Sequence, residues 1–182
     1  MDKAIGLVEY KTTASGISAA DSMVKTAEVE IISSQTVCPG KYIILLKGKL
    51  SAVNSAIEKG IKDYAEKVID SFILGNPHDD IFYAINGTSK VDEFESIGII
   101  ETFSAASAII AADAAAKAAK VNLIEIRLAR GMCGKSYLIL SGELAAVEAA
   151  IDAGSKVIGE TGMLLDKSII ARPDKKIWER IV

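Results

Sequence analysis

The residues best suited to chemistry are two cysteines and one histidine. Cys38 lies in the run TVCPGKY, between two strand-like segments, and Cys133 lies in the run ARGMCGKSY. The two cysteines are far apart in the chain and lack C-x-x-C spacing, so one chain offers neither a disulfide framework nor a self-contained zinc site. His78 is the only histidine, and no Ser/His/Asp, Cys/His or HExxH arrangement can be assembled around it. We therefore expect no catalytic residues and no enzymatic activity.

The turn that follows Cys38 contains residue types that suit a reactive thiolate. Pro39 fixes the backbone angle φ, Gly40 permits a conformation that other residues resist, and the Lys41 ammonium would favour the thiolate over the thiol. A free cysteine, however, usually behaves as a small apolar side chain packed against its neighbours. The residues alone leave both interpretations of Cys38 open, a metal ligand or a structural thiol.

Composition and charge argue against several classes of partner. Of the 182 residues, half are apolar, and 21 Lys and Arg stand against 24 Asp and Glu, for a formal charge of −3. Because no basic block is present, we expect no binding to nucleic acid or to an anionic membrane. The start of the chain lacks a basic leader followed by an apolar stretch, and the most apolar segment is interrupted by Asp113 and Lys117 before it reaches bilayer length. We expect a cytoplasmic protein with no membrane segment.

The chain contains an internal repeat. The segment AIGLVEYKTTASGISAADSMVKTAEVEII, from Ala4, recurs from Ser96 as SIGIIETFSAASAIIAADAAAKAAKVNLI, a shift of 92 residues. After the cysteine region the shift becomes 94, so the second copy has two extra residues in that loop. The positions of the first copy that recur unchanged are Ile5, Gly6, Glu9, Ala14, Ser15, Ala19, Ala20, Asp21, Lys25, Ala27, Val29, Gly40, Lys41, Leu46, Gly48, Leu50, Val53, Ile57 and Gly60. A repeat of this length implies two similar domains of about ninety residues.

The predicted elements of each domain alternate between strand and helix. In the first copy, AIGLVEY, VEIISSQTV, KYIILLKG and KVIDSFIL have the character of strands, and the two segments between them have helical spacing. The order strand, helix, strand, strand, helix, strand is that of the split βαβ, ferredoxin-like plan. We therefore predict an α+β protein with domains at residues 1–90 and 91–182. Residues 75–96, with an Asn86-Gly87 turn signal, are interpreted as the tail of the first domain and a linker.

These features resemble those of a known family. The runs AADSMVKTAEVEI and AADAAAKAAKVNL, each followed by a Gly-Lys loop and a second helix, are similar to the two halves of tandem-domain bacterial microcompartment shell proteins. The run CPGKY, with RPDKKIW near the end of the chain, resembles the T-type shell proteins of propanediol-utilisation compartments. The resemblance implies two tandem microcompartment (BMC) domains, a pseudohexameric homotrimer, and a place in the shell of a compartment beside other shell proteins.

The resemblance also assigns residues to the edge of the shell tile. The family's edge lysine, in a D-x-x-x-K-x-A pattern, falls on Lys25 and Lys117, although an ion pair with the aspartate four residues earlier on a solvated helix face is an alternative role. Such lysines pack near an Arg-Pro loop of a neighbouring tile, which Arg172 matches. The first copy has Asn76 at the corresponding place, so we expect the two edges to differ.

Finally, the resemblance gives Cys38 a function. The loop before the third strand lines the central pore in the family, which places near the axis Cys38, Pro39, Gly40 and Lys41 from the first copy and Gly131, Met132, Cys133, Gly134 and Lys135 from the second. A threefold axis would bring three copies of Cys38 together, and T-type proteins hold a [4Fe-4S] cluster there. The cluster implies electron transfer across the shell, with a redox enzyme or flavoprotein of the lumen or cytosol as partner; delivery or exchange of whole clusters is the alternative that the sequence leaves open.

Three alternatives remain open at this point. Cys133 is either a secondary redox or cluster-contacting residue or a structural one. The same fold would also suit a metal-free pore for metabolites. A tandem small-molecule-binding regulatory module, which would not assemble into sheets, is the third.

Overall fold

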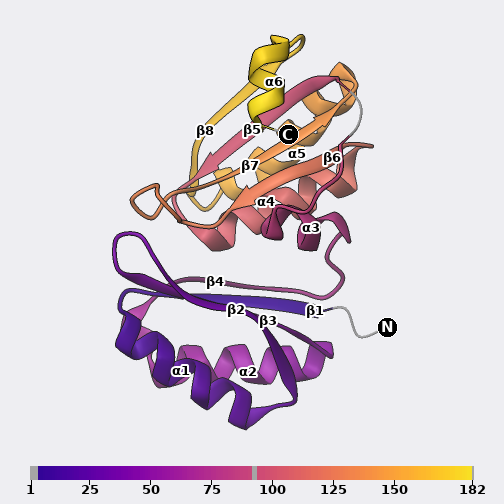
Figure 1. Ribbon diagram of the computed structural model, residues 1–182. Helices are drawn as coiled ribbons and strands as arrows, with labels where there is room; N and C mark the ends of the chain where they lie inside the picture. The colour runs from indigo at the N-terminus through magenta and orange to yellow at the C-terminus, as the bar shows by residue number, and fades with distance from the viewer. Residues whose placement is uncertain (1–3, 92–93, 182) are drawn as a thin grey trace. The chain divides into compact units, whose positions relative to one another are not determined.

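The computed structural model describes residues 4–91 and 94–181 and divides the chain into two compact units (Figure 1). The first unit contains the residues up to Pro77 together with Ala129–Gly134, and the second contains His78–Leu128 and the residues from Lys135 onward. No helix within the described ranges is both long and apolar enough to cross a bilayer. The division at residue 90 that the repeat suggests stays a prediction, because this grouping follows packing rather than sequence similarity.

The first unit is a four-stranded antiparallel sheet with two helices on one face (Figure 1). The sheet order is β2-β3-β1-β4. Its elements are β1 (Ala4–Tyr10), α1 (Thr13–Thr26), β2 (Val29–Val37), β3 (Lys41–Gly48), α2 (Leu50–Asp63), a 3₁₀ turn (Ala65–Lys67) and β4 (Val68–Leu74). The predicted ferredoxin-like order is confirmed.

The second unit repeats this plan and has a further helix at each end. Its sheet order is β6-β7-β5-β8. The elements are α3 (Asp80–Asn86), β5 (Ser96–Thr102), α4 (Ala105–Ala118), β6 (Asn122–Arg127), β7 (Ser136–Gly142), α5 (Leu144–Gly159), β8 (Leu164–Ile170) and α6 (Lys175–Ile181). The predicted α+β class with two repeated sheets is confirmed.

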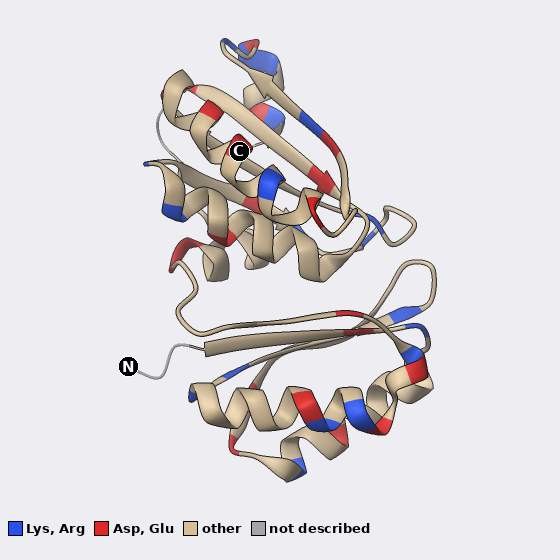
Figure 2. Cartoon of the chain, turned by 180° about the vertical axis from the view of Figure 1, so that it is seen from behind, with Lys and Arg blue, Asp and Glu red and all other residues tan. Residues whose placement is uncertain are grey.

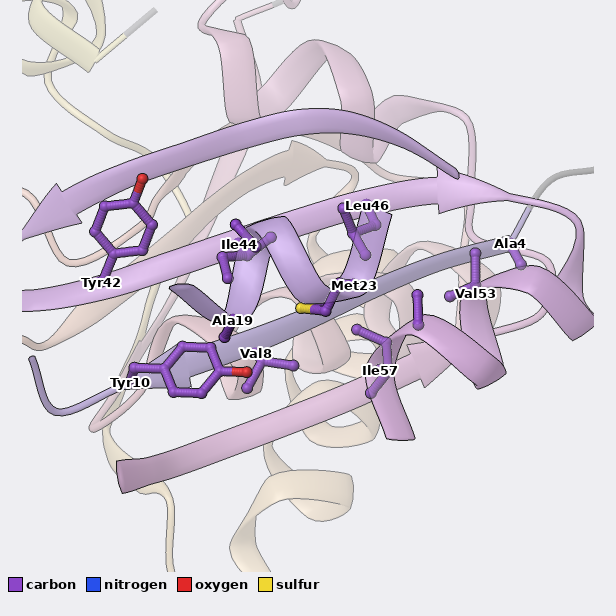
Figure 3. Close-up of a cluster of buried hydrophobic side chains, with 12 residues drawn as sticks. Ala4, Val8, Tyr10, Ala19, Met23, Tyr42, Ile44, Leu46, Val53 and Ile57 are labelled. Atoms are coloured by element: carbon purple, nitrogen blue, oxygen red, sulfur yellow. The ribbon is translucent and has the colours of Figure 1, made fainter. Parts of the chain in front are cut away.

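The core of the first unit forms because alternate strand residues face the helices. Figure 3 shows Val8 of β1 and Ile44 and Leu46 of β3 directed toward Met23 of α1 and Ile57 of α2, and all five are buried. Successive strand side chains point to opposite faces, so every second residue supplies this layer.

One glycine in each copy permits a helix to lie close to the central strand. A Cβ atom on Gly6 of β1 would lie 2.7 Å from Cγ1 of Ile57, and one on Gly98 of β5 would lie 2.7 Å from Cγ1 of Ile151. Both distances are too short for any side chain. The repeated glycine is therefore explained by close packing of helix on strand.

The expected linker contains a helix. Residues 80–86 form α3, and the Asn86-Gly87 signal marks its C-terminal end rather than a turn between strands. Gly87 has φ +64, and its N–H lies 3.4 Å from the carbonyl oxygen of Ala84. Asn-Gly suits a left-handed helix cap as well as a turn, so the local signal could not distinguish the two.

The Tyr10→Phe substitution is expected to leave the free energy of unfolding unchanged or to raise it by about 1 kcal/mol. The Tyr10 side chain is fully buried, and no described residue forms a hydrogen bond with its hydroxyl. Urea denaturation at pH 7 measures the effect. Tyr42→Phe is the matched control, because the Tyr42 hydroxyl lies 2.9 Å from the Ser34 hydroxyl, and its loss should cost about 1 kcal/mol. A larger loss for Tyr10→Phe than for Tyr42→Phe would contradict the prediction.

The same residue gives a pH dependence. Burial is the largest cause that raises the pKa of Tyr10 above its ordinary value, so the folded state favours the neutral phenol. This contribution to stability is fully present below about pH 10, the ordinary tyrosine pKa, and is lost as the pH rises further. Wild type should therefore lose more stability than Tyr10→Phe between neutral and strongly alkaline pH, and equal losses would show that Tyr10 does not contribute.

Candidate functional site

The turn between β2 and β3 presents Cys38 at the end of a hairpin. The Gly40 N–H donates to the carbonyl oxygen of Val37 over 2.9 Å, which closes the turn. Gly40 has φ +113, a conformation that favours glycine, as its sequence position predicts. The peptide bond between Cys38 and Pro39 is cis. Cys38 is partly buried at this end of the sheet.

A loop of the second repeat belongs to the first unit and packs on this turn. The Cys38 N–H donates to the carbonyl oxygen of Ala129 over 3.0 Å. A Cβ atom on Gly134 would lie 3.0 Å from the carbonyl oxygen of Cys38. Ala129 and Cys133 have φ angles of +53 and +52. The two-residue insertion is thus part of a loop whose left-handed residues bring it against the cysteine turn.

Together the two loops surround an open hollow of about 370 Å³. It is lined by Thr36, Val37, Cys38, Pro39, Gly40, Arg130 and Gly131. Of the predicted pore residues, the structure therefore brings Cys38, Pro39 and Gly40 together with Gly131. Met132 and the exposed Cys133 lie further along the same loop.

Lys41 forms an ion pair with the buried carboxylate of Glu9. Its Nζ lies 2.8 Å from Oε1 of Glu9, whose side chain is fully buried, and 3.5 Å from the carbonyl oxygen of Gly134. Because Glu9 compensates the charge of Lys41, the cation that lines the hollow beside Cys38 is Arg130. Sequence reasoning missed Glu9 as a site residue, although its recurrence in both copies was a signal.

The second repeat has the same pair of residue types in a more exposed setting. Lys135 Nζ lies 3.0 Å from Oε1 of Glu101, and their side chains are 43% and 27% exposed. Lys135 belongs to the second unit, unlike the rest of its predicted loop. This Lys-Glu pair is therefore solvated, whereas the pair in the first repeat is not.

A short polar cluster lies at the end of β6 and the start of β7, on either side of the loop that connects them. The Tyr137 hydroxyl donates to Oε2 of Glu125 over 2.7 Å, and the Arg127 guanidinium lies 5.2 Å from the centre of the Tyr137 ring. Burial, followed by the Glu125 carboxylate, raises the pKa of Tyr137 to about 12. The hydrogen bond to Glu125 raises the pKa of Arg127. Both groups thus keep their protons at neutral pH.

One chain by itself does not supply a metal site. Among residues 4–91 and 94–181, no group of three or more His, Cys, Asp or Glu side chains could hold a metal ion. Cys38 has the donor chemistry that an iron–sulfur cluster requires, and the residue is partly exposed at the end of a hairpin. The residues present fit a cluster only if several chains contribute one thiolate each.

The two predicted edge lysines have different surroundings. Lys25 Nζ lies 2.6 Å from Asp21, and both side chains are well exposed. Lys117 Nζ lies 2.6 Å from Asp113, but Asp113 is buried and also accepts a hydrogen bond of 2.8 Å from the His78 N–H. The sequence pattern is the same in both copies, so it did not reveal the added role of Asp113.

Arg172, the third predicted edge residue, lies in the loop between β8 and α6. It lines a hollow of about 360 Å³ together with Phe94, Glu143 and Pro173. In the view of Figure 2, basic and acidic residues are interspersed over both units rather than gathered by sign. The edge assignments therefore rest on single residues and not on a charged patch.

Comparison with known proteins identifies relatives along the whole chain. The family model of the BMC domain matches residues 4–77 and 96–173. The chain is 38% identical over 182 residues to the bacterial microcompartment shell protein PduT of Citrobacter freundii, and the match covers 100% of this chain and 99% of that protein.

Two solved structures are similar in fold. A microcompartment protein from Desulfitobacterium hafniense is 44% identical, with a TM-score of 0.89 over 98% of this chain and 99% of that one. The fused permuted hexameric shell protein of the RMM microcompartment is 23% identical, with a TM-score of 0.69 over 88% of this chain and 85% of that one. The second likeness bears on the fold alone.

Proposed function

The chain belongs to the BMC-domain family and is a shell protein of a bacterial microcompartment, and we propose that three copies form a pseudohexagonal tile with a [4Fe-4S] cluster at its axis. Each chain would supply two of the six similar units around the ring. Other shell proteins would meet the tile at its edges, as the shell proteins among its relatives suggest. The role is structural and requires no bond-making step on a substrate.

The observation that carries the cluster proposal is the position of Cys38. Cys38 is only partly buried at the end of the β2–β3 hairpin, beside a loop of the second repeat. Rotation of three chains about one axis brings three copies of the same residue together. Three Cys38 thiolates would then replace three of the four cysteines that usually hold such a cluster. One iron would remain for water or an outside ligand.

The residues around Cys38 would position the cluster and compensate its negative charge. The Gly40 N–H bond to Val37 and the Cys38 N–H bond to Ala129 hold the turn, so two hydrogen bonds fix the backbone that carries the thiol. Arg130 adds a positive charge to the hollow, which favours a negatively charged occupant. A bound cluster would accept and release one electron. A redox enzyme or flavoprotein on either side of the shell is the partner this chemistry requires.

Shell assembly should depend on Lys25. We expect Lys25→Ala to leave the oligomer intact and to abolish two-dimensional arrays, because Lys25 is the more exposed edge lysine and its removal leaves the fold untouched. Negative-stain electron microscopy measures the arrays, and native mass spectrometry measures the oligomer. Lys59→Ala is the matched control, since Lys59 also forms an i,i+4 ion pair, with Asp63 on α2, although the lysine comes first there. Arrays that survive in Lys25→Ala, or vanish equally in Lys59→Ala, would contradict the edge assignment.

A further inference from the structure

The helices α3 and α6 end their repeats in the same way. The pair Asn76-Pro77 precedes α3, and the pair Arg172-Pro173 precedes α6. The two segments align at a shift of 96 residues, so His78 corresponds to Asp174. The Asp80 N–H donates to Nδ1 of His78 over 3.3 Å, and the Lys176 N–H donates to Oδ1 of Asp174 over 2.8 Å. The two end segments thus begin with the same local hydrogen bond. Ile81 of α3 corresponds to Ile177 of α6.

Within the second unit, α3 packs against α4 and β6 (Figure 1). The His78 N–H donates to Oδ1 of Asp113 over 2.8 Å. Leu123 of β6 lines a hollow together with Tyr83 of α3 and is only 2% exposed. Ile81 is fully buried. An end segment therefore covers the surface of α4 and β6.

The equivalent surface of the first repeat, formed by α1 and β2, is exposed. Asp21 corresponds to Asp113, and their side chains are 61% and 9% exposed. Ile31 corresponds to Leu123 and is 41% exposed rather than 2%. Ile17 and Val24, which lie one turn either side of Asp21, are 55% and 38% exposed.

The equivalent end segment is exposed as well. Ile177 of α6 is 50% exposed, although its counterpart in α3 is buried. Trp178 anchors α6 to its own unit through an edge-to-face contact with Phe94, with ring centres 5.2 Å apart. An apolar surface and the apolar helix residue that matches it are thus both left uncovered in one chain.

The charges at two equivalent positions differ between the repeats in a way that matches α6 to the α1–β2 surface. Asp80 and Asn122 line the same hollow in the second unit, and their counterparts are Lys176 and Glu30. The acidic position of α3 has become basic in α6, and a neutral position of the receiving surface has become acidic. Glu30 lies 3.0 Å from Lys47 Nζ within its own sheet, but its side chain is 68% exposed and can meet a second cation. Complementary charges steer partners and suppress wrong ones. The sequence of α6 therefore suits the α1–β2 surface.

We infer that α6 of one copy docks on the α1–β2 surface of the next copy and repeats between chains the contact that α3 makes within the second unit. Ile177 packs against Ile31, Lys176 pairs with Glu30, and the Asp174 N–H donates to the Asp21 carboxylate. The contact is head-to-tail, so it closes into a ring only when the last copy meets the first. This inference rests on the proposed trimer and names the surfaces that hold it together.

Two aspartate variants test the head-to-tail contact. Ile177→Asp removes the end segment as a partner, and Ile31→Asp removes the receiving surface, so each variant alone should be a monomer by native mass spectrometry. When the two are mixed, one intact contact remains between them. We expect a 1:1 heterodimer that does not grow to a trimer. Formation of this dimer also shows that both variants are folded.

The matched control is Leu144→Asp. Leu144 and its counterpart Leu50 are 41% and 49% exposed, so neither repeat covers this position, and the variant should remain a trimer. If wild type is a trimer and both Ile177→Asp and Ile31→Asp remain trimers, the copies meet through another surface, and the inference fails while the shell-tile proposal stands. If wild type forms no trimer at any concentration, the proposed tile itself fails, and this contact fails with it.

A charge reversal provides a second measurement that does not perturb apolar packing. Lys176→Glu should raise the concentration at which trimers dissociate about tenfold or more, because it faces Glu30 with a like charge. Lys176→Glu combined with Glu30→Lys should restore most of the loss. Independent effects of the two substitutions, with no restoration, would overturn the pairing of these residues.

Discussion

Protein purified without oxygen is expected to contain about four iron atoms and about four acid-labile sulfides per trimer, and the Cys38→Ser variant almost none. Serine has nearly the same size as cysteine but is a poor ligand for iron in such clusters. The turn should therefore keep its Cys38 N–H bond to Ala129, which uses only backbone atoms. Visible absorption and the electron paramagnetic resonance of the reduced protein provide readouts independent of metal analysis.

Cys133→Ser is the matched control for this experiment. Cys133 is exposed and lies in the loop that packs beside Cys38. Cys133→Ser therefore makes the same Cys-to-Ser change in a neighbouring loop. We expect it to retain iron and sulfide. Loss of the cluster in both variants would assign Cys133 a role at the cluster. If wild type takes up no iron even after cluster reconstitution, Cys38 is a structural thiol, and the protein is a plain shell tile or a metabolite pore.

Lys41→Met is expected to lower the free energy of unfolding by about 3 kcal/mol. The substitution leaves the fully buried Glu9 carboxylate without the ammonium that lies 2.8 Å away. It also removes the contact between Lys41 Nζ and the carbonyl oxygen of Gly134, so the two loops beside Cys38 should separate more easily. Urea denaturation at pH 7 and fixed protein concentration measures the change.

Lys135→Met is the matched control in the second repeat. Lys135 and Glu101 form the same pair of residue types but are partly exposed, and a solvated ion pair contributes about 0.5 kcal/mol. Adding Glu9→Gln to Lys41→Met should recover part of the loss, because the buried charge is then removed. Equal losses for Lys41→Met and Lys135→Met would show that burial does not distinguish the two pairs.

The local signals of the chain were sufficient for most of the fold. The internal repeat predicted two domains of the same fold, and strand alternation and helical spacing predicted the order of the strands and helices. Turn residues were predicted where their role is local, as at Gly40. The two short end helices, α3 and α6, were not predicted. At α3, the Asn86-Gly87 pair was interpreted as a turn signal, because a helix cap and a turn use the same residues.

The candidate site was only partly predictable. The pairing of Lys41 with Glu9 depends on the antiparallel register of β1 and β3, in which Glu9 lies opposite Ile43. Both residues recur in the second copy, yet nothing in their types shows that one pair is buried and the other exposed. Likewise, the packing of Ala129–Gly134 on the Cys38 turn joins segments about ninety residues apart.

By itself, the sequence determined the repeated α+β plan, the placement of a lone thiol at a hairpin turn, and the absence of a catalytic motif, because periodicity, turn chemistry and residue spacing act over short distances. The tertiary structure decided which of two similar surfaces is covered. Asp21 and Asp113 occupy the same place in the same pattern, but only Asp113 meets the His78 N–H. Whether a residue is buried or its charge compensated depends on which distant segment packs against it. Because the two repeats have nearly the same residues on the two surfaces, the sequence does not show which surface is covered.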